Sequence, residues 1–135
     1  MTSGENGGTY TVLVVDDDPS VLATYCRLLR RAGYSPVAEP DPQRILADGA
    51  VACSVDLLLL DYRMPGMDGL TLLAELRRRE CRARCILISA FLNEDVQTRA
   101  ERLGVDRVLQ KPVDCDLLKG AIERLLPLRD VRGRA

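Results

Sequence analysis

Acidic side chains follow two short apolar runs in this sequence. The triplet Asp16–Asp18 comes directly after the run Tyr10–Val15, and Asp61 follows the run Leu57–Leu60. Three carboxylates that converge on one spot repel each other unless a cation lies between them. Because the chain contains no histidine and the candidate ligands are all oxygens, we expect that cation to be Mg²⁺, which takes one or two carboxylates together with water and phosphate oxygens.

A hydroxyl and an ammonium group stand at comparable places later in the chain. Ser89 ends the run Cys85–Ser89, and Lys111 follows the run Arg107–Leu109. A carboxylate beside Mg²⁺ can attack phosphorus and form an acyl phosphate, whose oxygens an ammonium and a hydroxyl then bind. Taken singly, the serine is typical of a helix cap and the lysine of a solvated side chain. Together with the carboxylates they indicate phosphoryl chemistry.

The hydrophobic pattern predicts the elements that position these groups. Short apolar runs alternate with segments whose apolar residues recur at helical spacing, which gives five strand–helix units. The expected strands are Tyr10–Val15, Ser35–Ala38, Leu57–Leu60, Cys85–Ser89 and Arg107–Leu109. The expected helices are Ser20–Ala32, Pro42–Ala50, Leu70–Arg79, Glu94–Leu103 and Asp116–Leu126. This alternation predicts a three-layer α/β fold, a doubly wound parallel sheet that binds ligands beyond the carboxyl ends of its strands.

Length and composition predict one domain, over residues 10–127, between a flexible lead-in at 1–9 and a short tail at 128–135. The net charge of −1 gives no electrostatic reason to expect direct binding of nucleic acid or of an anionic membrane. No apolar run approaches the length of a membrane span, and no signal-peptide core is visible, so we expect a cytoplasmic protein. The five cysteines, without any histidine, are expected to be free thiols and not metal ligands.

A cluster of arginines, Arg77–Arg79 with Arg82 and Arg84, ends the third expected helix. Cations at a helix C-terminus interact favourably with the helix dipole. Because no aromatic residues are interleaved with them, we interpret these arginines as a solvated face and not as a nucleic-acid patch.

Four segments carry a family resemblance: VLVVDDDPS, LLLLDYRMPGMDG, ILISA and VLQKP. In this order they resemble the receiver domain of bacterial two-component response regulators, over about residues 10–127. The resemblance implies a flavodoxin-like fold with strand order 2-1-3-4-5. It implies that Asp61 accepts a phosphoryl group from a histidine kinase or a histidine phosphotransfer protein. It also implies that Asp17 binds Mg²⁺ directly, that Asp16 does so mainly through water, and that the backbone carbonyl of Arg63 completes the protein ligands.

The resemblance further implies that Ser89 and Lys111 hold the phosphoryl group and that the Lys111–Pro112 peptide is cis. Many receivers carry an aromatic residue three positions before the lysine, where this chain has Val108. We therefore expect the output face, formed by the fourth helix, the fifth strand and the fifth helix, to shift without an aromatic flip. The same face is a candidate for homodimer formation.

Arg63 and Phe91 occupy positions that flank the acyl phosphate in this family. One hypothesis is that Arg63 pairs with phosphoryl oxygens and Phe91 blocks water, so that self-dephosphorylation is slow. The alternative is a solvated arginine and a half-buried ring. The sequence does not indicate the kinase or the downstream partner, and both a free-standing regulator and a piece of a larger one remain open.

Two functions from other classes are also considered. A haloacid-dehalogenase-type phosphatase would use Asp16 as its nucleophile, but the chain is short for that fold. A receiver-like protein-binding module would keep the fold without using phosphorylation. The presence of every required residue gives no support to that module, and only the missing aromatic at Val108 points toward it.

Overall fold

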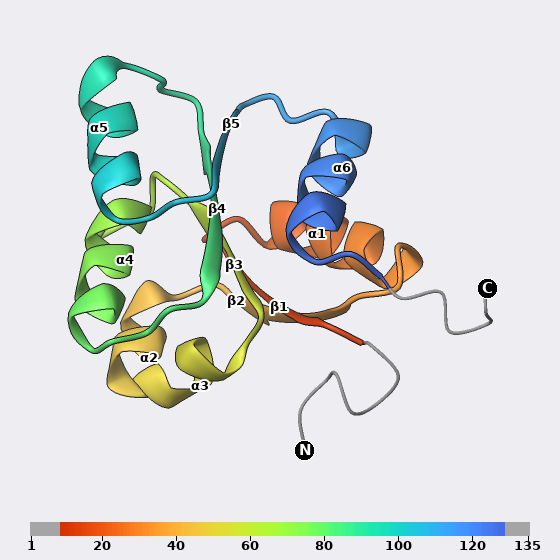
Figure 1. Cartoon of the computed structure of the whole chain (residues 1–135), viewed down its shortest axis with the longest axis horizontal. Coiled ribbons are helices and arrows are strands. Elements are labelled where there is room, and N and C mark those ends of the chain that lie inside the picture. The colour runs from red at the N-terminus through yellow and green to blue at the C-terminus, as the bar shows by residue number, and fades with distance from the viewer. Residues whose placement is uncertain (1–8, 129–135) are drawn as a thin grey trace.

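Five parallel strands form one sheet in the order β2-β1-β3-β4-β5, which confirms the predicted fold class and strand order (Figure 1). The strands are β1 (Thr11–Val15), β2 (Ser35–Glu39), β3 (Leu57–Asp61), β4 (Arg84–Ser89) and β5 (Arg107–Gln110). The helices are α1 (Pro19–Arg31), α2 (Pro42–Ala47), α3 (Gly49–Ser54), α4 (Gly69–Arg78), α5 (Glu94–Arg102) and α6 (Cys115–Leu125). This computed structural model describes residues 9–128; apart from Thr9 and Leu128, the predicted lead-in and tail lie outside the described residues.

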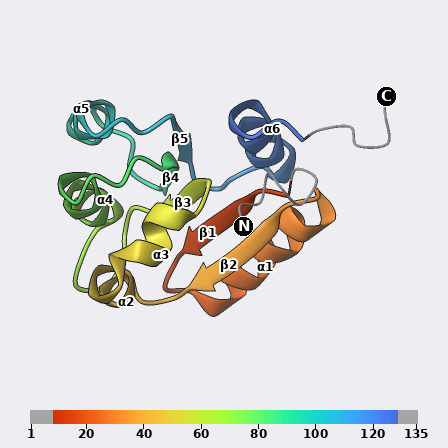
Figure 2. The same ribbon diagram turned by 60° about the horizontal axis from the view of Figure 1, so that its bottom comes forward.

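The helices divide between the two faces of the sheet, as Figures 1 and 2 show. Helices α2 to α5 cover one face, where Leu58, Leu60 and Leu87 point into the core. Helices α1 and α6 cover the other face, over Leu57 and Leu59. The run Leu57–Leu60 is therefore buried on both faces, as its continuous apolar character predicts.

The second helix differs from its prediction. A single helix was expected over Pro42–Ala50, but the chain forms α2 and α3, which meet at Asp48. Asp48 leaves the helical region, with φ −139° and ψ 76°, and Gly49 begins the next helix. Glycine has the freest backbone of all residues, so a break here costs little. The prediction missed the helix after the break because α3 has only six residues, of which Ala52 alone is buried, so it is too short to show a helical period.

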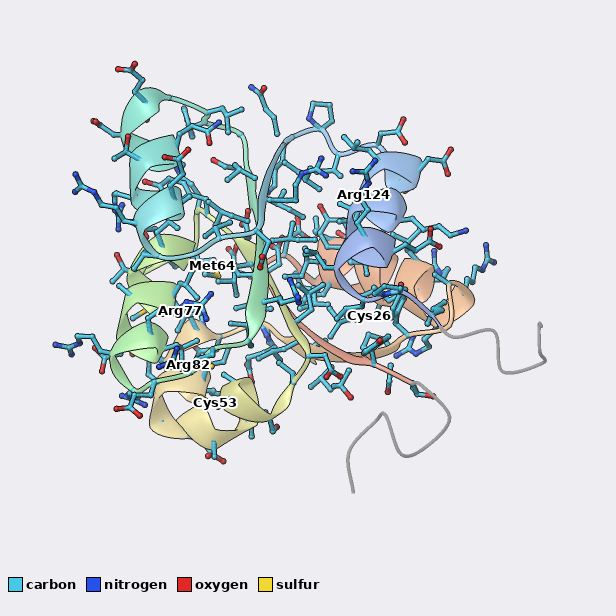
Figure 3. The ribbon with its side chains drawn as sticks, in the orientation of Figure 1. Cys26, Cys53, Met64, Arg77, Arg82 and Arg124 are labelled. Carbon is cyan, nitrogen blue, oxygen red and sulfur yellow. The ribbon has the colours of Figure 1, made fainter. Side chains whose placement is uncertain are left out.

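The arginine cluster is only partly the solvated face that was predicted. Arg77 lies on the sheet-facing side of α4 (Figure 3). Its guanidinium donates to the carbonyls of Leu103, Cys81 and Ala83 at 2.8, 2.9 and 2.8 Å. A planar guanidinium with five N–H donors suits such a role, because it pairs carbonyls that the chain's turns leave without partners. Arg77 thus links two loops, and the prediction was wrong for this residue.

Helix caps hold the N-termini of the helices near the carboxyl ends of the strands. The Asp18 side chain accepts from the backbone N–H of Ser20 and caps α1, directly before Pro19. The Asp68 carboxylate does the same for α4 and the Asn93 amide oxygen for α5. In the part of the chain that the structure describes, no helix is long and apolar enough to cross a membrane.

Candidate functional site

Three carboxylates meet at the carboxyl edge of the sheet. Oxygens of Asp16, Asp17 and Asp61 all lie within 4.8 Å of one another. The convergence follows from strand pairing: β1 and β3 are parallel neighbours, with Val15 beside Leu60, so the residues that follow them come together. Asp16 and Asp61 are 2% and 5% exposed, whereas Asp17 is open to solvent. An oxygen-only cluster with one open side fits Mg²⁺, which keeps part of its water shell.

Lys111 brings the positive charge to this cluster. Its Nζ lies 2.9 Å from Oδ1 of Asp61, and the side chain remains one-third exposed. That Oδ1 atom is buried and accepts no well-aligned hydrogen bond from the described residues, so the ion pair is its main polar contact. The Lys111–Pro112 peptide is cis, as the resemblance implied. One ammonium facing three carboxylates leaves the site with excess negative charge, which a divalent cation would balance.

Burial, together with the neighbouring charges, changes the pKa of Asp16, Asp61 and Lys111. Burial raises the pKa of Asp16 from 3.8 to about 6; a backbone N–H from Asp18 opposes the rise, and the Asp61 carboxylate adds to it. Burial also raises the pKa of Asp61, although Lys111 acts against this. For Lys111, burial acts to lower the pKa, but Asp61 and the other two carboxylates outweigh burial and raise it. The lysine is therefore a fixed cation, while both buried carboxylates are costly to ionise.

Ser89 lies at the end of β4 but does not reach Asp61 with its hydroxyl. The side chain is fully buried, donates its proton to the carbonyl of Phe91 at 2.6 Å and accepts from the Phe91 N–H at 2.9 Å. Asp61 itself pairs with Ile88, one residue earlier in β4. The structure thus brings Asp16, Asp17, Asp61 and Lys111 together, and it places Ser89 next to them with its proton engaged elsewhere.

Arg63 and Phe91 stack on each other above this edge. The guanidinium carbon of Arg63 lies 4.4 Å from the centroid of the Phe91 ring, in a cation–π contact. Phe91 is 48% exposed and Arg63 is exposed. Val108 is half-buried against the core beneath α2 to α5, with no ring to move.

Two residues of the site went unrecognised in the sequence. A Cβ on Gly69 would lie 2.5 Å from the carbonyl oxygen of Asp61, so only glycine lets α4 begin against the Asp61 backbone. The sequence indicated only a turn there. The second is Tyr25: burial, with the charges of Asp16 and Asp61 nearby, raises its pKa to about 12, which keeps the phenol neutral.

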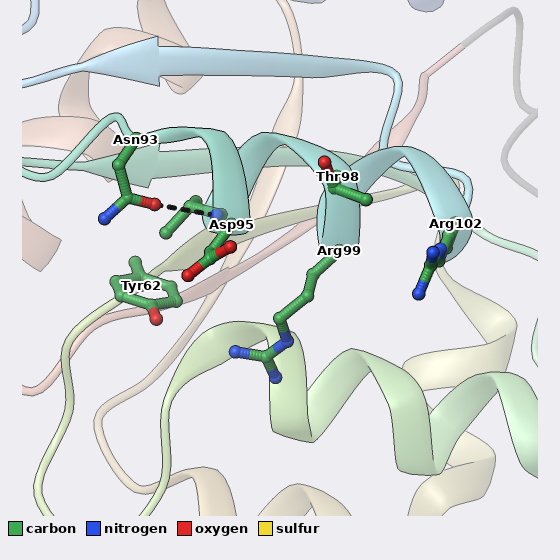
Figure 4. A pocket seen from close by; sticks show the side chains of 7 residues that line it. Tyr62, Asn93, Asp95, Thr98, Arg99 and Arg102 are labelled. Atoms are coloured by element: carbon green, nitrogen blue, oxygen red, sulfur yellow. Dashed lines mark hydrogen bonds between the residues drawn. The ribbon is translucent and has the colours of Figure 1, made fainter.

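A groove of about 560 Å³ lies beside this edge, between Tyr62 and α5 (Figure 4). Asn93, Asp95, Thr98, Arg99 and Arg102 line it. Asp61 and Lys111 are not among the lining residues, so the carboxylate cluster opens separately from this groove.

The fold and the carboxyl-edge cluster are those of a receiver domain, a phosphoacceptor switch. Residues 12–123 match the response regulator receiver domain family, and this chain belongs to that family. It is thus a receiver domain of two-component signalling. Receiver domains interact with histidine kinases and with output domains.

Individual relatives place the chain among bacterial regulators. It is 34% identical over 125 residues to the chemotaxis protein CheY of Treponema pallidum, covering 89% of this chain and 83% of that protein. It is 28% identical to sporulation initiation phosphotransferase F of Bacillus subtilis, over 87% of this chain and 94% of the relative. It is 35% identical over 115 residues, 85% of this chain, to the DNA-binding transcriptional regulator NtrC of Salmonella typhimurium, but spans only 24% of that protein's length.

Solved structures agree on the fold. A crystal structure of the CheX–CheY–BeF3–Mg²⁺ complex from Borrelia burgdorferi superposes with a TM-score of 0.81 and 23% identity, covering 92% of this chain and 94% of the matched one. A receiver domain protein from Clostridium thermocellum gives a TM-score of 0.78 at 24% identity, over 87% and 94% of the two chains.

Proposed function

We propose that Asp61 is the phosphoryl acceptor of this receiver domain and that the donor is a phosphohistidine. The observation that carries the proposal is the buried Asp61 carboxylate, paired with Lys111 at 2.9 Å and within 4.8 Å of two further carboxylates. A buried carboxylate that is costly to ionise, next to a fixed ammonium, is poised for chemistry and not for stability. The chain is a switch that assists its own phosphorylation and dephosphorylation, and not an enzyme that turns over other substrates.

The transfer uses the residues as follows. An Asp61 carboxylate oxygen attacks phosphorus, the new P–O bond forms as the P–N bond to histidine breaks, and the imidazole nitrogen keeps the electron pair. Lys111 exchanges its ion pair with the carboxylate for one with the phosphoryl oxygens, which become the more negative partner. Ser89 donates its hydroxyl proton to another phosphoryl oxygen.

Asp16, Asp17, Asp61 and the backbone carbonyl of Arg63 are proposed to hold Mg²⁺. The fit is one of donor chemistry: three carboxylates in one cluster and no nitrogen or sulfur ligand among them. When bound, Mg²⁺ neutralises charge on the transferring phosphoryl group. The Borrelia burgdorferi complex contains BeF3 and Mg²⁺, which supports the same chemistry here.

The lifetime of the acyl phosphate is proposed to depend on Arg63 and Phe91. Both residues lie in the loops that flank Asp61, where their side chains would restrict the approach of water whether or not they remain stacked. Because both side chains are exposed beside the site, we favour shielding by the two side chains over direct pairing of Arg63 with the phosphoryl oxygens. Replacing either residue by alanine should shorten the lifetime. An unchanged rate of acyl phosphate hydrolysis in both variants would rule out this role of Arg63 and Phe91.

The partners proposed are a histidine kinase or histidine phosphotransfer protein upstream, and a protein or output domain downstream. The proposed output and dimer face is α5, β5 and α6, the counterpart of the predicted fourth helix, fifth strand and fifth helix. Leu117 on α6 is 49% exposed and could contribute to such a face. We propose a cytoplasmic location and no direct contact with nucleic acid or membrane.

The test is intact-mass spectrometry after incubation with Mg²⁺ and acetyl phosphate. Wild type should gain one phosphoryl group, and Asp61→Asn should gain none. Asp106→Asn is the matched control, since Asp106 lies at the opposite edge of the sheet, and it should label normally. An adduct that survives Asp61→Asn would move the acceptor to Asp16. A folded wild type without any adduct would favour the phosphorylation-independent binding module.

A further inference from the structure

The hydroxyl of Ser89 has a single proton, and the structure shows where it goes. The proton is donated to the Phe91 carbonyl at 2.6 Å, and the same oxygen accepts the Phe91 N–H at 2.9 Å. A serine hydroxyl can donate only once. If Ser89 donates to a phosphoryl oxygen on Asp61, the Phe91 carbonyl must lose its donor. The phosphorylated state and the present conformation of Phe91 therefore compete for one proton.

The Phe91 ring is also held by a contact that reaches the other side of the acceptor. Arg63, over the ring at 4.4 Å, lies two residues after Asp61 in the β3–α4 loop, whereas Phe91 lies two residues after Ser89 in the β4–α5 loop. The ring is half exposed, so few packing contacts resist its movement. Ser89, Phe91 and Arg63 thus form one chain of contacts that joins both loops around Asp61.

We propose that Phe91 is the positioning residue that holds this receiver in its idle state and carries its conformational signal, in place of the aromatic residue that is absent at Val108. This inference rests on the proposed phosphorylation of Asp61. When Ser89 turns its proton to the phosphoryl group, Phe91 loses its backbone hydrogen bonds to that hydroxyl and releases Arg63. Because Asn93, two residues further on, caps α5, the change in the loop is passed to α5 and to the groove beside Tyr62.

The competition has a thermodynamic consequence. A contact that stabilises only the idle state lowers the affinity for anything that stabilises the active state, and its removal raises that affinity. Arg63→Ala should therefore bind beryllofluoride with Mg²⁺ about two- to fivefold more tightly than wild type, the range expected for an exposed cation–π contact. Arg63→Lys should lie in between. A merely structural stack would leave this affinity unchanged or weaken it.

The chain offers a clean reporter, because Phe91 is its only phenylalanine. Replacing it with 4-fluorophenylalanine gives a protein with one ¹⁹F resonance from the ring. We expect this resonance to move when beryllofluoride and Mg²⁺ are added to wild type, and to stay in place in Asp61→Asn. In Arg63→Ala and Ser89→Ala, the ¹⁹F resonance of the protein without ligand should already be shifted toward its position in the wild-type complex with beryllofluoride and Mg²⁺. Arg82→Ala, an exposed arginine outside the site, is the control and should match wild type.

The same spectra separate the two proposals, because bound beryllofluoride has its own ¹⁹F signals. Bound signals with a stationary Phe91 resonance would overturn the role of Phe91 and leave Asp61 as the acceptor. An absence of bound signals, together with no phosphoryl adduct in the mass spectrum, would overturn the proposed function and this inference with it.

Discussion

Aspartates stand at both ends of the sheet, in opposite electrostatic surroundings. At the amino ends of the strands, Asp56 accepts from the backbone N–H of Thr11 at 2.8 Å, and Asp106 accepts from that of Cys85 at 2.9 Å. At the carboxyl ends, Asp16 and Asp61 are buried beside each other and share one lysine. Aspartate carboxylates thus accept backbone hydrogen bonds at one edge of the sheet and lie close to other carboxylates at the opposite edge.

The surroundings of a carboxylate therefore help to distinguish a structural role from a functional one. A carboxylate that accepts backbone N–H bonds is favoured in its charged form and stabilises the chain around it. Buried carboxylates that repel each other are favoured in their neutral form, and they oppose folding at neutral pH. Such a cost is tolerated where a cation or a phosphoryl group is to be bound. Substitutions at the two edges should therefore have different effects on stability and on phosphorylation.

Asp16→Asn should stabilise the protein in EDTA at pH 7.5. Burial raises the pKa of Asp16 from 3.8 to about 6, so the folded state binds more protons than the unfolded state between these values, and stability falls as pH rises through them. At 1.36 kcal/mol per pKa unit, the gain from the substitution is about 3 kcal/mol at most, and it should vanish near pH 4. Urea unfolding at both pH values measures it.

The chain contains no histidine, so no imidazole titrates in this range. Saturating Mg²⁺ should cancel the advantage of Asp16→Asn at pH 7.5, because the ion binds the wild-type carboxylate. Wild-type stability that rises steadily from pH 4 to 7.5 in EDTA would contradict the view that this edge is crowded.

Gly69→Ala should destabilise the protein by roughly 2–3 kcal/mol and slow the labelling of Asp61 by acetyl phosphate. The added Cβ meets the Asp61 carbonyl oxygen at 2.5 Å, so the acceptor backbone or α4 must shift. Gly120→Ala in α6 is the matched control, since nothing lies within 4 Å of its added Cβ. Alanine at position 120 should raise the free energy of unfolding by at most about 1 kcal/mol, because alanine has the higher helix propensity. Equal labelling rates in the two variants would mean that the close contact of Gly69 does not affect the reactivity of Asp61.

Asp106→Ala should lower the free energy of unfolding, measured in urea, by about 2 kcal/mol, because the buried Cys85 N–H loses the acceptor oxygen of Asp106. Asp106→Asn keeps an oxygen and should cost less. Labelling of Asp61 should stay at the wild-type level in both. A loss of labelling in a folded Asp106 variant would mean that the two edges of the sheet are coupled and that Asp106 is not purely structural.

Arg84→Ala should change stability by less than about 0.5 kcal/mol. Arg84 faces Asp106 at 3.6 Å with half of its side chain exposed, and solvent screens such pairs. A larger loss would show that the charge of Asp106 contributes to this edge beyond its hydrogen bond. Added salt is the simple check, since it should reduce any effect of the pair.

The periodicity of the sequence was enough to predict the five strands and most of the helices. Apolar spacing is a local property, so β3 and α1 could be recognised without knowledge of their neighbours. The break at Asp48 was missed because α2 and α3 have six residues each, which is too short to show where one helical period ends and the next begins. Arg77 was missed because its carbonyl partners, such as Leu103, lie on other loops.

The strand pattern in the sequence is enough to specify which groups reach the carboxyl edge of the sheet. Once the strands are parallel, the residues that follow them must meet there, so Asp16, Asp17, Asp61 and Lys111 could be predicted as one cluster. The tertiary structure alone decided which way the groups point: the proton of Ser89 goes to Phe91, and Gly69 lies against the Asp61 backbone. The reason is that strands, and the residues that follow them, can be recognised from local pattern, whereas hydrogen bonds and close contacts depend on how separate loops pack in space.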